Sequence, residues 1–267
     1  MADHTTYGLV CSELSEDLSK TNLGELKLDS FQDNSVQIKI KAASLNFPDL
    51  LMTQGKYQNR PNLPFALGME GAGIVEKVGS GVSSFKEGDE VMFGGWGHGA
   101  IAESIILPEG LVSLKPKSLN FSEAASFKTA YLTAYVGLIR RGELKQGETL
   151  LVHGASGGVG MAAVQMGKLY GAKVIASGTS DEKLKIVKTW GADEIINTGL
   201  EGSVSFREEV KELTDGKGAD VIYDPVGGDV FDESIRCINW GGRLLIIGFT
   251  SGRTVSYTHL RAHETKA

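Results

Sequence analysis

The spacing of apolar and polar residues changes near the middle of the chain. In the first 120 residues, short alternating segments are broken by glycine and proline, and the clearest of them are 36–42, 73–78 and 90–93. Alternation with a period of two is typical of strands, so this part predicts a strand-rich, partly barrel-like domain. A helix is predicted over 123–140, with Ser122 as its N-terminal cap. We therefore expect a domain boundary near Asn120.

The second half alternates apolar runs with segments that favour helix. Strands are predicted at 149–152, 174–177, 194–197, 220–224 and 243–247, and helices at 161–170, 182–190, 204–213 and 230–238. Five strands separated by four helices predict a doubly wound parallel sheet, an α/β fold whose ligands bind at the carboxyl ends of the strands. The turns expected at that edge are 154–160, 224–228 and 248–252.

The turn after the first of these strands has the spacing of a dinucleotide-binding fingerprint. Ala155, Gly157 and Gly160 occupy the three small-residue positions of G-x-G-x-x-G. Small residues are needed because the backbone bends sharply and approaches a pyrophosphate closely, while free N–H groups and the helix dipole face the anion. A glycine-rich structural turn has the same spacing, but the complete strand–helix–strand unit favours nucleotide binding. The predicted cofactor contacts in this turn are Ala155, Ser156, Gly157, Gly158, Val159 and Gly160.

The end of the second strand distinguishes the two nicotinamide dinucleotides. An NAD site places an acid about 20 residues past the glycines, where it bonds the ribose hydroxyls. Here residues 176–180 read Ala-Ser-Gly-Thr-Ser, and no acid appears before Asp181. The hydroxyls of Ser177 and Thr179 can donate to a 2'-phosphate and Lys183 can supply charge, although a lysine there is equally typical of a solvated helix. The sequence therefore favours NADPH as the cofactor.

Composition excludes several classes of partner. The 267 residues are enough for one large or two ordinary domains. The net charge is −6, and positive and negative residues are well mixed along the chain. No basic face and no apolar run of membrane-spanning length is present, so we expect neither nucleic acid nor membrane as a partner. The N-terminus lacks the apolar core of a signal peptide, which predicts a cytoplasmic protein. Cys11 and Cys237 are too few to suggest a disulfide framework or a cysteine-rich metal site.

An ordered series of short motifs carries a family resemblance. The motifs are Ser44-Leu-Asn-Phe-Pro-Asp49, Gly55-Lys-Tyr57, Gly68-Met-Glu-Gly-Ala-Gly73, Gly79-Ser-Gly-Val82, Gly88-Asp-Glu-Val91, Leu132-Thr-Ala-Tyr135, His153-Gly-Ala-Ser-Gly-Gly-Val-Gly160, Asp224-Pro-Val-Gly-Gly228 and Gly248-Phe-Thr-Ser-Gly252. This series resembles the quinone oxidoreductase branch of the medium-chain dehydrogenase/reductase superfamily, over roughly residues 7–253. The resemblance implies a GroES-like catalytic domain at 1–120, a Rossmann NADPH-binding domain at 121–253, and a homodimer.

The zinc-binding pattern of the superfamily's alcohol dehydrogenases is missing. Where they have an early cysteine and Gly-His-Glu, this chain has Leu45-Asn46 and Gly68-Met-Glu70. Zinc needs nitrogen, sulfur or oxygen donors in a tetrahedral array, and a thioether with an amide is a poor substitute. We expect Glu70 to be a hydrogen-bonding or structural acid and the site to be free of metal. The histidines considered as alternative ligands are His98 in a glycine-rich loop, His153 at the end of a core strand, and His259 and His263 near the C-terminus.

A site without a Lewis acid favours acceptors that already tolerate negative charge. A quinone, or the double bond of an α,β-unsaturated carbonyl compound, can accept a hydride and carry the charge on a conjugated oxygen. The sequence therefore predicts an NADPH-dependent reductase of such a small molecule. Two alternatives stay open: a reductase of enones or enoyl thioesters, and an NADPH-binding protein without turnover.

The resemblance also implies roles for single residues. Asn46 and Tyr57 map to positions that face nicotinamide and substrate, where Asn46 bonds the cofactor or a substrate oxygen and Tyr57 orients a carbonyl or donates a proton. The simpler interpretations are that Asn46 holds a turn and that Tyr57 is an amphipathic residue at the rim of the site, with its hydroxyl in water. The remaining implied cofactor contacts are Thr133, Asn197, Val226, Phe249, Thr250 and Ser251. Family members often have a tyrosine directly after the asparagine that corresponds to Asn197. Here Thr198 follows Asn197.

The last residues do not fit the family pattern. Relatives continue past 248–252 with elements that include a sixth strand, whereas residues 254–267 have no apolar period. We interpret 254–267 as a non-native-looking tail and expect the fifth strand to be a free edge.

Overall fold

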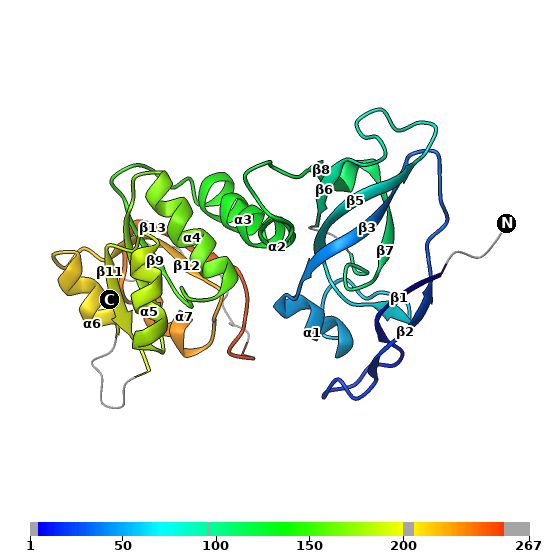
Figure 1. Cartoon of the computed structure of the whole chain (residues 1–267). Coiled ribbons are helices and arrows are strands. Elements are labelled where there is room, and N and C mark those ends of the chain that lie inside the picture. The colour runs from blue at the N-terminus through cyan, green and yellow to red at the C-terminus, as the bar shows by residue number, and fades with distance from the viewer. Residues whose placement is uncertain (1–4, 95–96, 200–205, 254–267) are drawn as a thin grey trace. The chain divides into compact units, whose positions relative to one another are not determined.

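The computed structural model describes residues 5–94, 97–199 and 206–253 (Figure 1). The chain divides into two compact units, the first ending at Thr129 and the second beginning at Ala130. The predicted tail at 254–267 lies outside the described residues. Within the described parts, no helix is both long and apolar enough to cross a membrane.

The first unit is built from antiparallel strands. A five-stranded sheet has the order β7-β3-β5-β6-β8, and a three-stranded sheet has the order β2-β1-β4. The elements are β1 (Thr5–Cys11), β2 (Thr21–Lys27), β3 (Ser35–Ser44), α1 (Phe47–Thr53), β4 (Phe65–Ala66), β5 (Glu70–Val78), β6 (Glu90–Phe93), β7 (Ser104–Pro108), the 3-10 turn η1 (Glu109–Leu111), β8 (Val112–Leu114) and α2 (Phe121–Ala125). Alternate residues of β3 and β5, among them Val36, Ile38 and Val75, are buried in one core. The period-two pattern is confirmed as a curled β domain.

The second unit is a parallel sheet with the order β11-β10-β9-β12-β13. Its elements are α3 (Lys128–Tyr135), the π-helix η2 (Val136–Arg141), β9 (Thr149–Val152), α4 (Gly158–Leu169), β10 (Lys173–Gly178), α5 (Asp181–Thr189), β11 (Glu194–Asn197), α6 (Phe206–Leu213), β12 (Ala219–Asp224), α7 (Asp229–Ser234) and β13 (Ile238–Ile246). This order is the doubly wound arrangement that the sequence predicts, and the fold class is confirmed.

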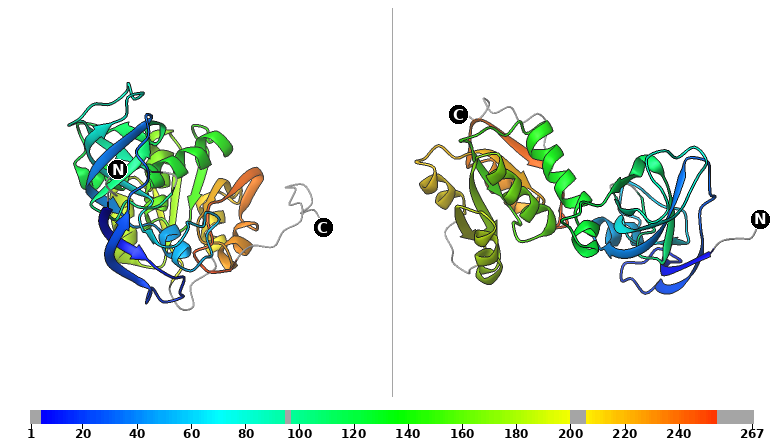
Figure 2. Two further views of the ribbon diagram at one scale, coloured as in Figure 1. Left: turned by 90° about the vertical axis from the view of Figure 1, so that its right-hand side faces the viewer. Right: turned by 45° about the horizontal axis from the view of Figure 1, so that its top comes forward.

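Helices cover both faces of this sheet (Figures 1 and 2). Leu150 and Val152 of β9 pack with residues of α3, α4 and α5, whereas the intervening Leu151 packs with residues of α6 and with Cys237. Because both faces of β9 are buried, its sequence is apolar throughout rather than alternating.

The single helix predicted over 123–140 is wrong in two respects. Asn120, not Ser122, caps α2: its Oδ1 accepts from the N–H of Glu123 at 2.9 Å, while its own N–H donates to Glu123 Oε2 at 2.8 Å. The helix then stops at Ala125, and α3 begins at Lys128. Buried Ala124 and Ala125 pack α2 against the first unit, which is why that unit extends past Asn120 to Thr129.

The boundary between the last helix and the last strand is also different from the prediction. The helix α7 ends at Ser234 rather than near residue 238, and β13 begins at Ile238, five residues before the predicted strand. Apolar residues continue through this turn, so the apolar pattern gives no sign of the change. Among the described residues, β13 is an edge strand of the sheet.

Candidate functional site

The glycine-rich turn between β9 and α4 is shaped for close approach by a ligand. Gly154 has a left-handed φ of +54°, and Gly157 precedes the helix in extended backbone with no side chain capping it. A Cβ on Gly160 would lie 2.4 Å from the carbonyl oxygen of Gly154, so only glycine fits there. A Cβ on Gly158 would meet nothing within 4 Å, which leaves the first turn of this 12-residue helix open. The positive end of the helix dipole and its free N–H groups suit a phosphate.

Two further segments lie beside this turn. Asp224 at the end of β12 is fully buried, and its Oδ1 accepts from the N–H groups of Val226 at 2.8 Å and Gly227 at 3.0 Å. Val226 Cγ2 would be 3.4 Å from a Cβ on Gly154, so residue 226 lies against the glycine turn. Thr250 and Ser251 donate their N–H groups to the carbonyls of Pro225 and Val226 at 3.1 and 3.0 Å. Val226 thus lies against the glycine turn, and Phe249, Thr250 and Ser251 lie beside residues 225–227.

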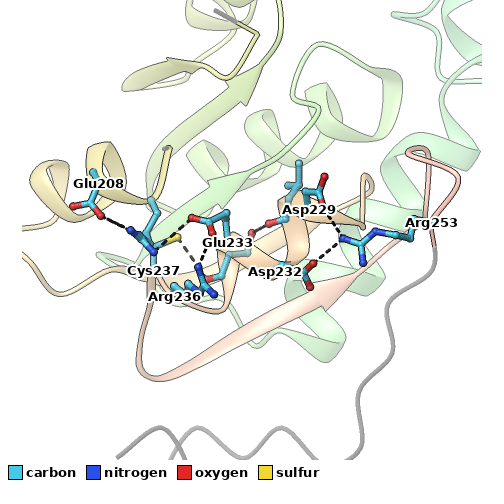
Figure 3. A network of polar contacts seen from close by, with 10 residues as sticks. Glu208, Asp229, Asp232, Glu233, Arg236, Cys237 and Arg253 are labelled. Carbon is cyan, nitrogen blue, oxygen red and sulfur yellow. Dashed lines mark hydrogen bonds and ion pairs between the residues drawn. The ribbon is translucent and has the colours of Figure 1, made fainter. Parts of the chain in front are cut away.

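Exposed ion pairs lie at the end of this segment (Figure 3). Arg253 lies 2.7 Å from carboxylate oxygens of both Asp229 and Asp232 at the start of α7. On the other side of α7, Glu233 pairs with Arg236 at 2.9 Å, and buried Cys237 follows. Burial raises the pKa of the Cys237 thiol to about 12, so this cysteine remains an unreactive thiol.

Ser177 does not lie where the prediction required. Its side chain is 2% exposed, and its Oγ is 2.7 Å from Nδ1 of the buried His153. The other ring nitrogen, Nε2, is 2.8 Å from Ser234 Oγ, whose hydroxyl donates to the Val230 carbonyl. Nε2 must therefore carry the proton, and Nδ1 accepts from Ser177. The Ser177 hydroxyl is thus committed to the core, an arrangement that does not favour the predicted phosphate contact.

The surroundings keep His153 neutral. Its ring meets Phe206 edge to face with centroids 4.9 Å apart, and burial lowers the pKa of His153 to about 3. The carbonyl of Ser177 accepts from the N–H of Ala155 at 3.0 Å. Ser177 therefore links the two: its side chain bonds His153 and its carbonyl bonds the glycine turn.

The other residues predicted near the 2'-phosphate remain at the surface. Thr179 and Lys183 are exposed, and the Lys183 N–H is 3.4 Å from the capping hydroxyl of Ser180. Asn197 is occupied: its Nδ2 donates to Asp181 Oδ1 at 2.7 Å, and its Oδ1 accepts from the Gly199 N–H at 2.9 Å. The sequence gives no sign of this asparagine–aspartate pair, because its members are 16 residues apart.

Thr133 lies away from these residues, on the groove between α3 and the edge strand. The groove has a volume of about 610 Å³ and is lined by Thr133, Arg141 and residues 244–247 at the end of β13, among others. Two α3–η2 residues on it, Leu132 and Val136, are 51% and 41% exposed.

Asn46 in the first unit is held by two buried carboxylates. Its Nδ2 donates to Glu70 Oε1 at 3.0 Å, and its backbone N–H donates to Asp49 Oδ2 at 2.7 Å. Glu70 and Asp49 are each 1% exposed, and Asp49 Oδ1 accepts from the Gly68 N–H at 2.9 Å. Burial raises the pKa of Asp49 above its ordinary value, partly offset by these two backbone donors. Sequence reasoning identified Asn46 and Glu70 separately but not their pairing.

Tyr57 lies at the margin of the first unit's second core. It is partly buried and packs against the cluster of Cys11, Met52, Phe65, Leu67 and Met69. Its ring is thus fixed by apolar neighbours, and none of the described residues hydrogen-bonds its hydroxyl. Such a tyrosine can present a donor to a ligand.

The residues of the first unit do not fit a zinc site. Met69, which stands where a histidine would be needed, is buried in the same apolar cluster. Both oxygens of Glu70 accept N–H groups, from Asn46 and from Thr129 at 2.8 Å. Throughout the described ranges, no three His, Cys, Asp or Glu residues come together as ligands. The donor set is therefore one for hydrogen bonding rather than for tetrahedral coordination.

Comparison with known families and proteins agrees with the two-unit description. Residues 32–117 match an alcohol dehydrogenase GroES-like domain, and residues 158–266 match a zinc-binding dehydrogenase domain. The chain is 39% identical over 91% of its length to a quinone oxidoreductase-like protein 2 homolog of Nematostella vectensis, and 35% identical over 92% to quinone oxidoreductase-like protein 2 of Rattus norvegicus. It spans 66% and 69% of these two curated relatives.

Solved structures give the same result. Escherichia coli quinone oxidoreductase complexed with NADPH matches 96% of this chain and 76% of its own, with 32% identity and a TM-score of 0.85. The CurK enoyl reductase matches 90% of this chain and 73% of its own, with 30% identity and a TM-score of 0.81.

Proposed function

Since the chain belongs to the quinone oxidoreductase branch of the medium-chain dehydrogenase/reductase superfamily, we propose that it transfers a hydride from NADPH to a quinone or an α,β-unsaturated carbonyl compound, without zinc. The open glycine turn at the start of α4 carries this proposal. The N-cap residue Gly157 has no side chain to bond the N–H groups of this turn, and a Cβ at residue 160 would collide with the backbone carbonyl of Gly154. Such a turn accommodates the pyrophosphate of a dinucleotide.

The preference for NADPH over NADH rests on the end of β10. No carboxylate stands at residues 176–180, where an acid would bond the ribose hydroxyls of NAD. Exposed Thr179 and Lys183 are the residues proposed to contact the 2'-phosphate. The similar quinone oxidoreductase of Escherichia coli is described in complex with NADPH, which supports the same choice.

The proposed chemistry needs hydrogen bonds more than a metal ion. When bound, NADPH supplies the hydride. Asn46 and Tyr57 are the side chains proposed to orient the acceptor, and the Tyr57 hydroxyl to donate a proton to the oxygen that gains charge. The residues 226 and 249–251 would line the cofactor beside the glycine turn, and Thr133 would contact it from α3.

Quinones are proposed first as acceptors, because the relatives reported above are named for them. The likeness to the CurK enoyl reductase supports enones and enoyl thioesters as the second candidate class. Both classes carry developing negative charge on a conjugated oxygen, so the same hydrogen-bond donors serve either.

The test follows the absorbance of NADPH after a simple quinone or a simple enone is added, with NADH in parallel. We expect faster consumption with NADPH than with NADH. Asn46→Ala should lower turnover by about 100-fold, the usual effect of removing a donor to a developing oxyanion, and Tyr57→Phe by about tenfold. The matched controls Asn22→Ala and Tyr7→Phe alter exposed residues of the same unit and should keep wild-type turnover.

Two results would contradict the proposal. Tight NADPH binding without consumption by either acceptor would indicate a binding protein rather than a reductase. Stoichiometric zinc in the purified protein, with turnover lost on its removal, would contradict the zinc-independent mechanism.

A further inference from the structure

Glu70 is a buried acid for which the proposed chemistry has no direct use. It is the first residue of β5 and is 1% exposed. Its Oε1 accepts from Asn46 Nδ2 at 3.0 Å, and its Oε2 accepts from the Thr129 N–H at 2.8 Å. A carboxylate is costly to bury unless its oxygens are hydrogen-bonded, and here each has a donor.

The surrounding backbone is built to keep this carboxylate in place. A Cβ on Gly94 would lie 2.6 Å from the Cβ of Glu70, so only glycine leaves room for the acid. Lys128 is the nearby cation, and its charge and that of Glu70 attract each other. The acid thus meets a close-packed backbone, two N–H donors and a neighbouring positive charge.

The contact with Glu70 determines which way the Asn46 amide points. An ionised carboxylate can only accept hydrogen bonds, so the NH₂ group of Asn46, not its oxygen, must face Glu70. The backbone N–H of Asn46 is fixed as well, by Asp49 Oδ2 at 2.7 Å. A half-buried asparagine that would otherwise rotate between two amide orientations is therefore held in one.

We propose that Glu70 is the positioning residue for Asn46, holding its amide in the single orientation that turnover requires. The inference rests on the proposed function for the role of Asn46 in turnover, while the pairing itself stands on geometry. Thr129, the last residue of the first unit, takes part because its N–H occupies the second oxygen of Glu70. With that oxygen engaged, the carboxylate cannot turn away from Asn46.

Reversing the polarity of the pair provides the test. In E70Q, the side chain has one oxygen for two donors, so an N–H group is left facing an N–H group. In N46D, the amide is replaced by a carboxylate that faces the carboxylate of Glu70, and neither group can donate a hydrogen bond to the other. In the double variant N46D/E70Q, the new amide at position 70 donates to the new carboxylate at position 46. The oxygen of the same amide still accepts from the Thr129 N–H, so both hydrogen bonds are restored.

We expect each single variant to lower the melting temperature. E70Q, which keeps the Asn46 amide but not its orientation, should lower turnover by about tenfold, and N46D, which removes the amide, by about 100-fold. The double variant should recover most of the lost melting temperature, because both hydrogen bonds return, but not turnover, because N46D removes the amide of Asn46. Val75→Ala is the matched control, because it opens a cavity on the same strand without touching Asn46. Well below its lowered melting temperature, it should retain wild-type turnover.

The outcomes separate this inference from the proposed function. Wild-type turnover in E70Q would overturn the positioning role, and failure of the double variant to recover the melting temperature would overturn the pairing. If wild-type protein reduces no quinone or enone, the proposed function fails. The side-chain amide protons of Asn46, followed by NMR, then decide the pairing: they should be protected from exchange in wild type and lose protection in E70Q, and equal exchange would overturn it.

Discussion

The Asn46 centre of the first unit and the His153 centre of the second are built from different polar groups. In the first unit, two carboxylates, Glu70 and Asp49, hold the side chain and backbone of Asn46. In the second unit, the neutral ring of His153 lies between two serine hydroxyls beneath the glycine turn. Burying a charged group costs more free energy than burying a neutral one, but the charged group forms stronger hydrogen bonds. A neutral centre adds no charge near the backbone N–H groups of the turn.

This difference indicates a division of labour. The first unit fixes a polar side chain in one orientation, which suits a group that contacts reacting atoms. The second unit presents backbone N–H groups of residues 158–160 at the start of α4, and no acidic residue stands in the first turn of that helix. In the proposed function, the first unit would orient the acceptor and the second would bind the dinucleotide.

The strongest way to break the second half of this comparison is to fill the glycine turn. In Gly160→Val, the new side chain would overlap the carbonyl of Gly154, because a Cβ alone would lie 2.4 Å from it. We expect NADPH affinity in a fluorescence titration to fall by about 100-fold or more, the scale of a severe packing error. Gly110→Ala is the control, since a Cβ there meets nothing within 4 Å. Unchanged affinity in Gly160→Val would contradict the binding role of the turn.

Lowering the pH should reduce the free energy of unfolding through His153. Because burial lowers the pKa of His153 to about 3, the unfolded chain binds a proton at this residue that the folded protein refuses. Its contribution to the free energy of unfolding is complete above about pH 6.5 and is lost as the pH falls toward 3. Between pH 6.5 and 5 the loss should be about 2 kcal/mol, at about 1.4 kcal/mol per pH unit.

The measurement is urea unfolding of wild type and of His153→Gln at both pH values. Glutamine keeps a donor and an acceptor but does not titrate, so its stability should change less over this range. An equal pH dependence in the two proteins would show that His153 is not the group responsible.

The smallest effect is expected at the exposed network of Figure 3. Asp229 is fully exposed and Arg253 is about half exposed, so water and salt screen both of the ion pairs of Arg253. Arg253→Ala should leave the melting temperature unchanged within error, in contrast to E70Q. A marked destabilisation would mean that this network, rather than the buried centres, holds the segment at 249–251.

Local signals made the second unit predictable. Its strands are short apolar runs separated by helices, and its glycine spacing is readable in one segment, so the sheet and the turn follow from neighbouring residues. The cap at Asn120 was also readable, because Asn120 and Glu123 have the spacing of a capping box. Ser122 lies inside α2, one residue past its start, and does not cap it.

The partnerships across the sequence were not predictable. Asn46 and Glu70 are 24 residues apart, His153 and Ser234 are 81 apart, and no periodicity connects either pair. Ser177 shows the consequence: its place at the end of a strand suggested a phosphate contact, but a distant histidine holds its hydroxyl in the core. Residue type and position give the candidates, and tertiary packing decides which of them face a ligand.

The division of labour is tested most directly by one paired measurement on Asn46→Ala: its NADPH affinity in titration and its turnover of a quinone at saturating NADPH. The account predicts that turnover falls by about 100-fold, as for loss of a donor at the reacting atoms. Affinity should change by about tenfold at most, since only one hydrogen bond is lost. Wild-type turnover together with a large loss of NADPH affinity would contradict it, because the first unit would then bind the dinucleotide rather than orient the acceptor.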